Sequence, residues 1–183
     1  MNDKLLSIII VLCSSALISC STVTLSTPFK DNATIETKQS FEGKWLSGDE
    51  VIQIAFDEKG VGNIGCLDWK AGKGFKIEHH LFTIHQGDEV FYGTGYDPLG
   101  KIPNAYHLFK FKVVEEKLIV WSPNVDSFIK LIGDEVFEGE VVGGKGHAAK
   151  MKVTSTEFLK FIETHEKNDL FDYENPNILT RIK

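Results

Sequence analysis

Hydrophobic and polar residues alternate along much of the chain from residue 41 to residue 153, which is typical of strands with one buried face. The first such segment, residues 52–56, passes through the turn residues 57–60 into the next segment, as in a β-hairpin. Short strands joined by turns at these intervals favour an antiparallel sheet that closes into a barrel or folds as a sandwich. Further strands are expected at residues 61–67, 75–85, 89–96, 106–114, 117–122, 136–142, 147–153 and 177–182.

Helical spacing replaces this alternation at two places in the last third of the chain. A short helix is expected at residues 124–132, between Pro123 and Gly133, and a longer one at residues 155–165, capped by Ser155. The fold class predicted is mainly β: an antiparallel barrel-like sheet with one C-terminal helix and one short additional helix. The apolar faces of the two helices are formed by Val125, Phe128, Ile129 and Ile132, and by Phe158, Leu159 and Ile162.

The first 19 residues have the pattern of an export signal. Lys4 precedes residues 5–18, which carry no charge. This run is shorter than the ~20 apolar residues that a membrane-spanning helix needs. Residues 1–19 are therefore predicted to be a signal peptide, and a permanent membrane attachment would need another anchor.

Leu17-Ile18-Ser19-Cys20 resembles the lipobox of bacterial lipoproteins. In that family a small residue precedes a cysteine that is diacylated on sulfur and becomes the first residue of the mature protein. The resemblance implies that lipid on Cys20 attaches the chain to a membrane of the cell envelope, because two or three acyl chains are sufficient for stable attachment. Ser21 is not Asp, which in the proteobacterial sorting rule implies the outer membrane if the source has two membranes. The alternative is an ordinary secretory signal cut at a nearby small residue.

Residues 20–40 are rich in Ser and Thr and show no hydrophobic periodicity. Such a composition buries too little apolar surface to offset the entropy of ordering the chain. The segment is predicted to be the lipidated N-terminus and a flexible tether, and residues 41–183 are predicted to form one domain.

Composition and charge exclude some classes of function. The chain has 183 residues, of which 42% are hydrophobic, and a net charge of −6. Arg181 is its single arginine. An acidic chain with so few guanidinium groups repels phosphate backbones, so no nucleic-acid partner is expected.

Candidate catalytic and metal-binding motifs fail on their context. Residues 60–65 match Gly-x-Gly-x-x-Gly and residues 139–145 resemble a P-loop, but both lie where strands and hairpins are expected. The histidines show no metal-binding spacing, although His107 could complete a site from a partner strand. Cys66 would be the one cysteine left in the domain, and we expect it to be a small buried apolar residue. No catalytic residue, metal site or cofactor is predicted.

Aromatic residues concentrate in the central strands. In a small barrel such residues either fill the interior or line a cavity for one small ligand. The candidate ligand-binding residues are Tyr92, Tyr106 and Trp121. The full group is Trp69, Phe75, Phe82, Phe91, Tyr92, Tyr96, Tyr106, Phe109, Phe111 and Trp121.

Gly43-Lys44-Trp45, on the first expected strand of the domain, resembles the Gly-x-Trp of the lipocalins and the wider calycins, where the Trp closes one end of a barrel. The order of strands, a late helix and a last strand also resembles the lipocalin plan over residues 41–183. The chain lacks the Thr-Asp-Tyr motif of that family and its Arg before the late helix, where Lys152 is nearest and Arg181 comes too late. The resemblance implies a lipocalin-like barrel, and no ligand residue is carried over from it.

The function expected from these observations is that of a membrane-anchored, non-enzymatic envelope lipoprotein that binds a small apolar ligand or a partner protein. An apolar cavity of about 300 Å³ or more would favour the small ligand. The alternative is an extracytoplasmic hydrolase with an unrecognised site. A cleft that gathers His79, His107 and a carboxylate would favour that enzyme.

Overall fold

The computed structural model describes residues 22–30, 32–48, 50–70, 74–87, 90–96, 105–142, 148–165 and 169–183. For residues 67–70, 74–79 and 96 the description covers the backbone only. The predicted signal peptide and Cys20 lie outside the described residues, as does the expected long loop at 97–104.

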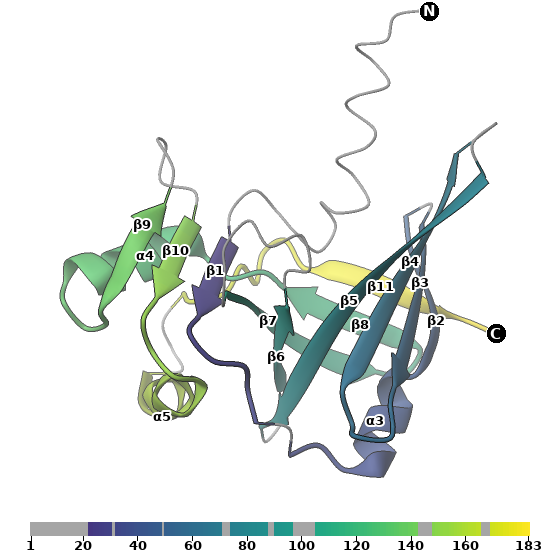
Figure 1. Ribbon diagram of the computed structural model, residues 1–183, viewed down its shortest axis with the longest axis horizontal. Helices are drawn as coiled ribbons and strands as arrows, with labels where there is room; N and C mark the ends of the chain where they lie inside the picture. Colours follow the sequence, from purple (N-terminus) through teal and green to yellow (C-terminus); the bar gives the residue numbers. More distant parts are fainter. Residues whose placement is uncertain are drawn as a thin grey trace, which may run out of the picture.

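Eight strands form a closed antiparallel barrel (Figure 1). The eight strands follow one another around the barrel in chain order, so the last strand, β11, lies between β8 and β2. Pairing of β6 with β7 closes the barrel. The predicted mainly β class is confirmed, and the barrel is compatible with a lipocalin-like one. Its strands are β2 (Gly43–Ser47), β3 (Glu50–Phe56), β4 (Gly62–Lys70), β5 (Gly74–Gln86), β6 (Phe91–Tyr96), β7 (Tyr106–Val114), β8 (Lys117–Trp121) and β11 (Asn177–Ile182).

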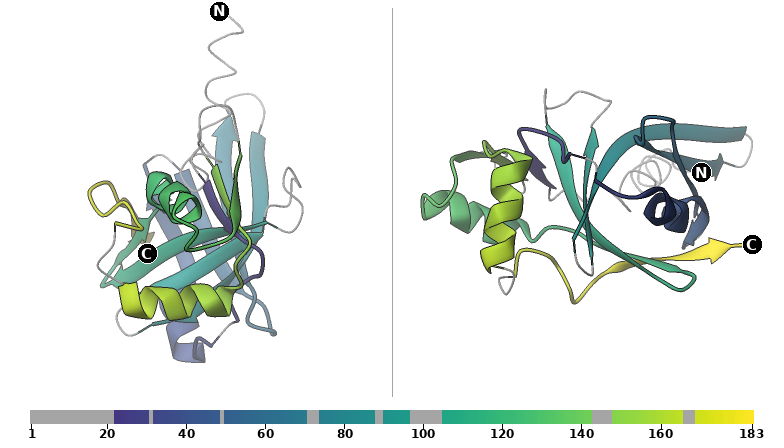
Figure 2. Two further views of the ribbon diagram at one scale, coloured as in Figure 1. Left: turned by 90° about the vertical axis from the view of Figure 1, so that its left-hand side faces the viewer. Right: turned by 90° about the horizontal axis from the view of Figure 1, so that it is seen from below.

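A smaller sheet extends from one side of the barrel (Figures 1 and 2). Strand β1 (Thr22–Leu25) pairs antiparallel with the start of β7 and parallel with β10 (Ala148–Met151), and β9 (Gly139–Val142) pairs with β10 at the edge. The helices α4 (Val125–Gly133) and α5 (Ser155–His165) lie beside these strands, while α3 (Ile35–Phe41) lies at the lower end of the barrel in Figure 1. Within the described residues no helix is both long and apolar enough to cross a membrane.

The segment predicted to be a flexible tether is ordered from Thr22 onward, so that prediction is wrong for the described residues. The side chains of Val23, Leu25 and Phe29 are at most 2% exposed. Three of the four residues of β1 are β-branched, which favours a strand. The segment is nevertheless too short for a periodicity to be recognised. The helix α3 begins at Thr34, whose side chain accepts a hydrogen bond from the backbone N–H of Thr37.

The late elements confirm the expected helices with one correction. Thr154, rather than Ser155, caps α5: its Oγ1 accepts from the N–H of Glu157, and the Glu157 carboxylate accepts from the N–H of Thr154. The N–H of Ser155 instead donates to Oγ1 of Thr27, 2.9 Å away, and so joins α5 to the segment after β1. The strand expected at residues 136–142 begins only at Gly139.

Strands β6 and β7 form a wall between two hydrophobic cores because their side chains alternate between its faces. Phe109 and Phe111 face the barrel, whereas Leu108 and Lys110 face the smaller sheet and its helices. The buried residues of the barrel core are Phe41, Trp45, Ile52, Ile54, Cys66, Phe82, Ile84, Phe111, Leu118, Val120 and Leu179. Those of the flank core are Val23, Leu25, Phe29, Tyr92, Leu108, Val125, Phe128, Ala149, Met151, Val153, Phe158, Ile162, Leu170 and Phe171.

Inside the barrel, a phenylalanine ring lies directly against Gly93. A Cβ added there would lie 2.6 Å from the ring of Phe111, too close for a real contact. We therefore expect Gly93→Ala to lower the free energy of unfolding by about 1–3 kcal/mol, measured by urea denaturation. Gly133→Ala is the matched control, since a Cβ there meets nothing within 4 Å. Equal midpoints for the two variants would contradict the prediction.

Candidate ligand-binding site

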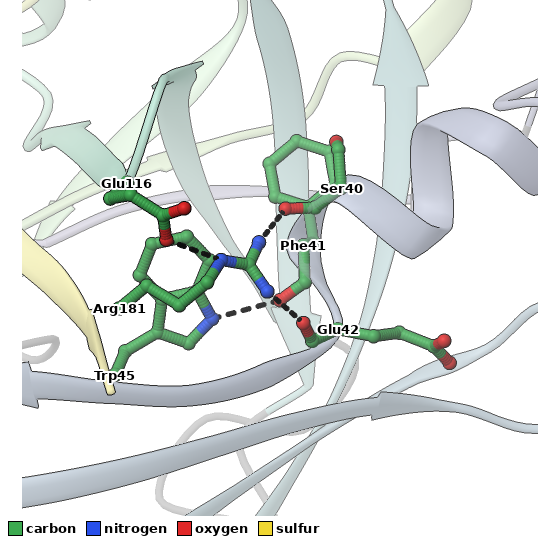
Figure 3. Close-up of polar contacts among 6 residues, drawn as sticks. All are labelled: Ser40, Phe41, Glu42, Trp45, Glu116 and Arg181. Atoms are coloured by element: carbon green, nitrogen blue, oxygen red, sulfur yellow. Dashed lines mark hydrogen bonds and ion pairs between the residues drawn. The ribbon is translucent and has the colours of Figure 1, made fainter. Parts of the chain in front are cut away.

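One end of the barrel is closed by Trp45 and the end of α3 (Figure 3). The Trp45 side chain is fully buried, and its Nε1 donates a hydrogen bond to the carbonyl oxygen of Phe41, 2.8 Å away. The Phe41 ring enters the barrel and meets Phe91 and Phe111 edge-on, at centroid distances of 4.9 and 5.2 Å. Trp45 is thus a buried residue of the barrel core with a satisfied indole N–H, in a barrel compatible with a lipocalin-like one.

Arg181 covers this end from outside. Its guanidinium carbon lies 4.3 Å from the centre of the Trp45 ring, and Nη1 donates to the carbonyl of Glu42 at 2.6 Å. Nη2 donates to the carbonyl of Ser40, and Nε lies 3.5 Å from Oε2 of Glu116 (Figure 3). A cation is favoured beside carbonyls at the C-terminal end of a helix, because the helix dipole is negative there. Arg181 therefore joins α3, β2 and the turn between β7 and β8.

Arg181 follows the late helix in the sequence, yet the fold brings it to the tryptophan. Strand β11 pairs with β2, and the register sets Arg181 directly opposite Trp45. Closure of the barrel brings β11 beside β2. Two residues that are more than a hundred positions apart in the sequence are therefore cross-strand neighbours.

Some apolar side chains that pack against the barrel core are only partly buried. Ile64, Phe109 and Val113 pack against the barrel core, yet each keeps part of its surface exposed. Phe109 lies on the wall next to Gly95, where an added Cβ would be 3.0 Å from its ring. Such accessible apolar side chains inside a barrel are typical of a site for a small apolar molecule. Cys66 is a small buried residue of this core, as predicted.

The candidate ligand residues Tyr92 and Tyr106 lie on the outer face of the wall of β6 and β7, and Trp121 is the last residue of β8. Tyr92 belongs to the flank core and Trp121 packs against it, while Tyr106 shares the face of Leu108 two residues later. None of the three lines the barrel interior, so the expectation that they surround a barrel cavity is wrong. Both faces of β6 and β7 carry aromatic residues, and the spacing alone cannot tell which face turns inward.

These outer aromatic residues surround a lysine of the chain itself. Lys110 is 5% exposed, its Nζ donates to the Tyr173 hydroxyl at 2.9 Å, and it lies 5.2 to 5.5 Å from the ring centres of Tyr92, Phe171 and Tyr173. Burial disfavours the ammonium, but the hydrogen bond to Tyr173 and the charge interactions with Tyr92 and Tyr173 outweigh it and raise the pKa of Lys110. The contribution of the charged Lys110 to the free energy of unfolding is therefore complete at neutral pH. It is lost only as the pH rises through the raised pKa of Lys110.

Substitution of Lys110 should separate its packing from its charge. We expect Lys110→Ala to destabilise the protein by about 2–3 kcal/mol, because it removes both the aliphatic stem and the attraction to the rings. Lys110→Met should cost less than half of this, since it keeps most of the volume and removes the cost of burying a charge. Thermal unfolding of both variants at neutral pH measures the difference. If both variants lose the same stability, the charge of Lys110 contributes more to stability than its packing does, which would contradict the prediction.

A metal ion needs a donor set of side chains such as His, Cys, Asp and Glu. Among the described side chains, no three of these residues lie close enough together to hold a metal ion. His107 alternates with Leu108 on β7 and so faces the barrel interior, while the side chain of His79 lies outside the description.

Comparisons leave the chain without a family assignment. No family model, curated protein or solved structure matches it.

Proposed function

We propose that this chain is a lipoprotein of the cell envelope, anchored by lipid on Cys20, whose barrel binds a small apolar ligand and catalyses no reaction. The anchor rests on the lipobox-like residues Leu17-Ile18-Ser19-Cys20 and on the uncharged run before them. The binding function rests on the barrel. In a source with two membranes, Ser21 favours the outer membrane as the place of attachment.

The observation that carries the proposed binding is the exposure of inward-facing apolar side chains. Ile64 on β4 and Phe109 and Val113 on β7 are only partly buried, whereas Trp45 at the closed end is fully buried. Exposed apolar surface inside a barrel is costly unless an apolar molecule covers it. A barrel of about eight strands has room for one small ligand.

Native mass spectrometry of the protein purified from its own membrane tests this proposal. A ligand-sized mass should remain bound at one copy per chain. The purified protein should also bind a neutral naphthylamine dye, and we expect Ile64→Trp to weaken that binding several-fold by filling the interior. Leu46→Trp is the matched control, because Leu46 is exposed on the outside of β2.

The outcomes separate the alternatives. Equal dye binding by wild type and Ile64→Trp, with both variants folded and no bound ligand, would overturn small-ligand binding and leave a partner protein as the better candidate. Ester or amide hydrolysis by the wild-type protein would overturn the non-enzymatic part. The mass of the N-terminal peptide decides the anchor: an unmodified Cys20 would exclude a lipoprotein.

A further inference from the structure

The ordered sheet begins two residues after the proposed lipid anchor. Strand β1 starts at Thr22. Consecutive Cα atoms are 3.8 Å apart, so the Cα of Cys20 lies within about 8 Å of the Cα of Thr22. A lipid on Cys20 would therefore hold the start of β1 at the membrane surface, with no tether of 20 residues to separate the domain from the bilayer.

Two exposed valines lie beside this point. Thr22 pairs with Ala148, and Ala148 pairs with Val142 at the end of β9. Because paired strands are about 4.8 Å apart, Val142 lies about 10 Å from Thr22. Val141 and Val142 are 43% and 36% exposed and point to opposite faces of the edge strand. The described end of β9 thus presents one exposed valine on each face.

Among the residues that the structure describes, the charges beside these valines do not oppose contact with a bilayer. Glu140 and Lys150 are directly opposite each other on β9 and β10, and they carry opposite signs. The pair adds no net charge next to the valines, so an anionic lipid surface would not repel this end of the sheet.

The direction of the strands also orients the barrel. Strands β1 and β10 are parallel and both begin at the upper end in Figure 1, whereas α3 closes the barrel at its lower end. The side view in Figure 2 shows the same arrangement. The start of β1 therefore lies toward the barrel end that α3 does not cover.

We propose that Val141 and Val142 contact the bilayer beside the lipidated Cys20, and that the barrel end opposite α3 faces the membrane. This inference rests on the proposed lipidation of Cys20. The acyl chains provide the attachment, and the two valines fix its orientation, because a second contact about 10 Å from the start of β1 prevents the domain from turning about its anchor. An apolar ligand would then enter from the membrane side.

Spin labels on the full-length lipidated protein test the orientation. Val142→Cys carries the label at the proposed contact. Val114→Cys is the matched control, because Val114 is 40% exposed and pairs with Lys117 at the turn beside Arg181 and the closed end. Wild-type protein measures background labelling, which should be low since Cys66 is buried. The protein is placed in vesicles of phosphatidylethanolamine and phosphatidylglycerol, and collisions with oxygen and with an aqueous nickel chelate are compared.

The expected result is a several-fold higher ratio of oxygen to nickel accessibility at position 142 than at position 114. The N-terminal mass and sedimentation with vesicles are measured on the same samples. If Cys20 is acylated and the protein sediments but the two labels have equal ratios, the orientation is wrong and the lipoprotein assignment stands. An unmodified Cys20 would overturn both proposals.

Discussion

A chain that begins at Phe41 should fail to fold stably, whereas one that begins at Ser21 should fold. The shorter chain loses Val23, Leu25 and Phe29, which are buried in the flank core. Complete burial of one such side chain contributes about 1.5–3 kcal/mol, so the three together contribute about 6 kcal/mol. This is comparable with the entire stability of a typical domain, about 5–15 kcal/mol. Circular dichroism and urea denaturation of the two chains measure the difference.

A single substitution provides the control for this truncation. In the chain that begins at Ser21, Phe29→Ala should lower the free energy of unfolding by about 3–4 kcal/mol, because it removes a ring that packs near His85, Tyr92 and Phe158. Ile35→Ala should have almost no effect, since Ile35 is exposed. A cooperative unfolding transition in the chain from Phe41, at the same midpoint as the longer chain, would contradict the role of this segment.

Loss of the arginine at the closed end should have the next largest effect. Arg181→Ala is expected to destabilise the protein by about 2–4 kcal/mol, because it removes two charged hydrogen bonds to backbone carbonyls and the attraction to the face of Trp45. The carbonyls of Ser40 and Glu42 would then need water as their donor. Urea denaturation followed by tryptophan fluorescence measures the change in stability.

Arg181→Lys distinguishes the shape of this side chain from its charge. Lysine keeps the positive charge but cannot donate to two carbonyls in the same plane, so we expect about half of the loss seen with alanine. Lys117→Ala, in the neighbouring strand, should change stability by less than about 0.5 kcal/mol because its side chain is exposed. Wild-type stability in Arg181→Ala would contradict the proposed closure.

The sequence predicted the elements of the barrel well because each strand is long enough for its alternation to be recognised. The strand expected at residues 177–182 and the helix at 155–165 match β11 and α5. The four residues of β1 were missed because a strand of that length between Ser and Thr residues shows no periodicity. Their place in the sheet is fixed by pairing with β7 and β10, which are distant in the sequence.

The candidate site was harder to predict than the fold. Phe109 and Tyr106 belong to one strand and differ by three positions, so they must point to opposite faces. The sequence contains aromatic residues on both faces, and only the flank core decides that Tyr106 turns away from the barrel. Arg181 could not be paired with Trp45 before it was known that the first and last strands of the barrel are neighbours.

The wall of β6 and β7 ties the two cores together thermodynamically. Strands β6 and β7 contribute side chains to both cores. Local unfolding of the flank core would remove the packing from their outer face, so the flank core and the barrel core are expected to unfold as one cooperative unit. A ligand that stabilises Phe109 and Phe111 from inside would raise the free energy of opening for β1 as well, because β1 pairs with the same strand β7. Ligand binding in the barrel would thus stabilise β1, which follows the proposed anchor. In the empty barrel the free energy of opening β1 would be lower.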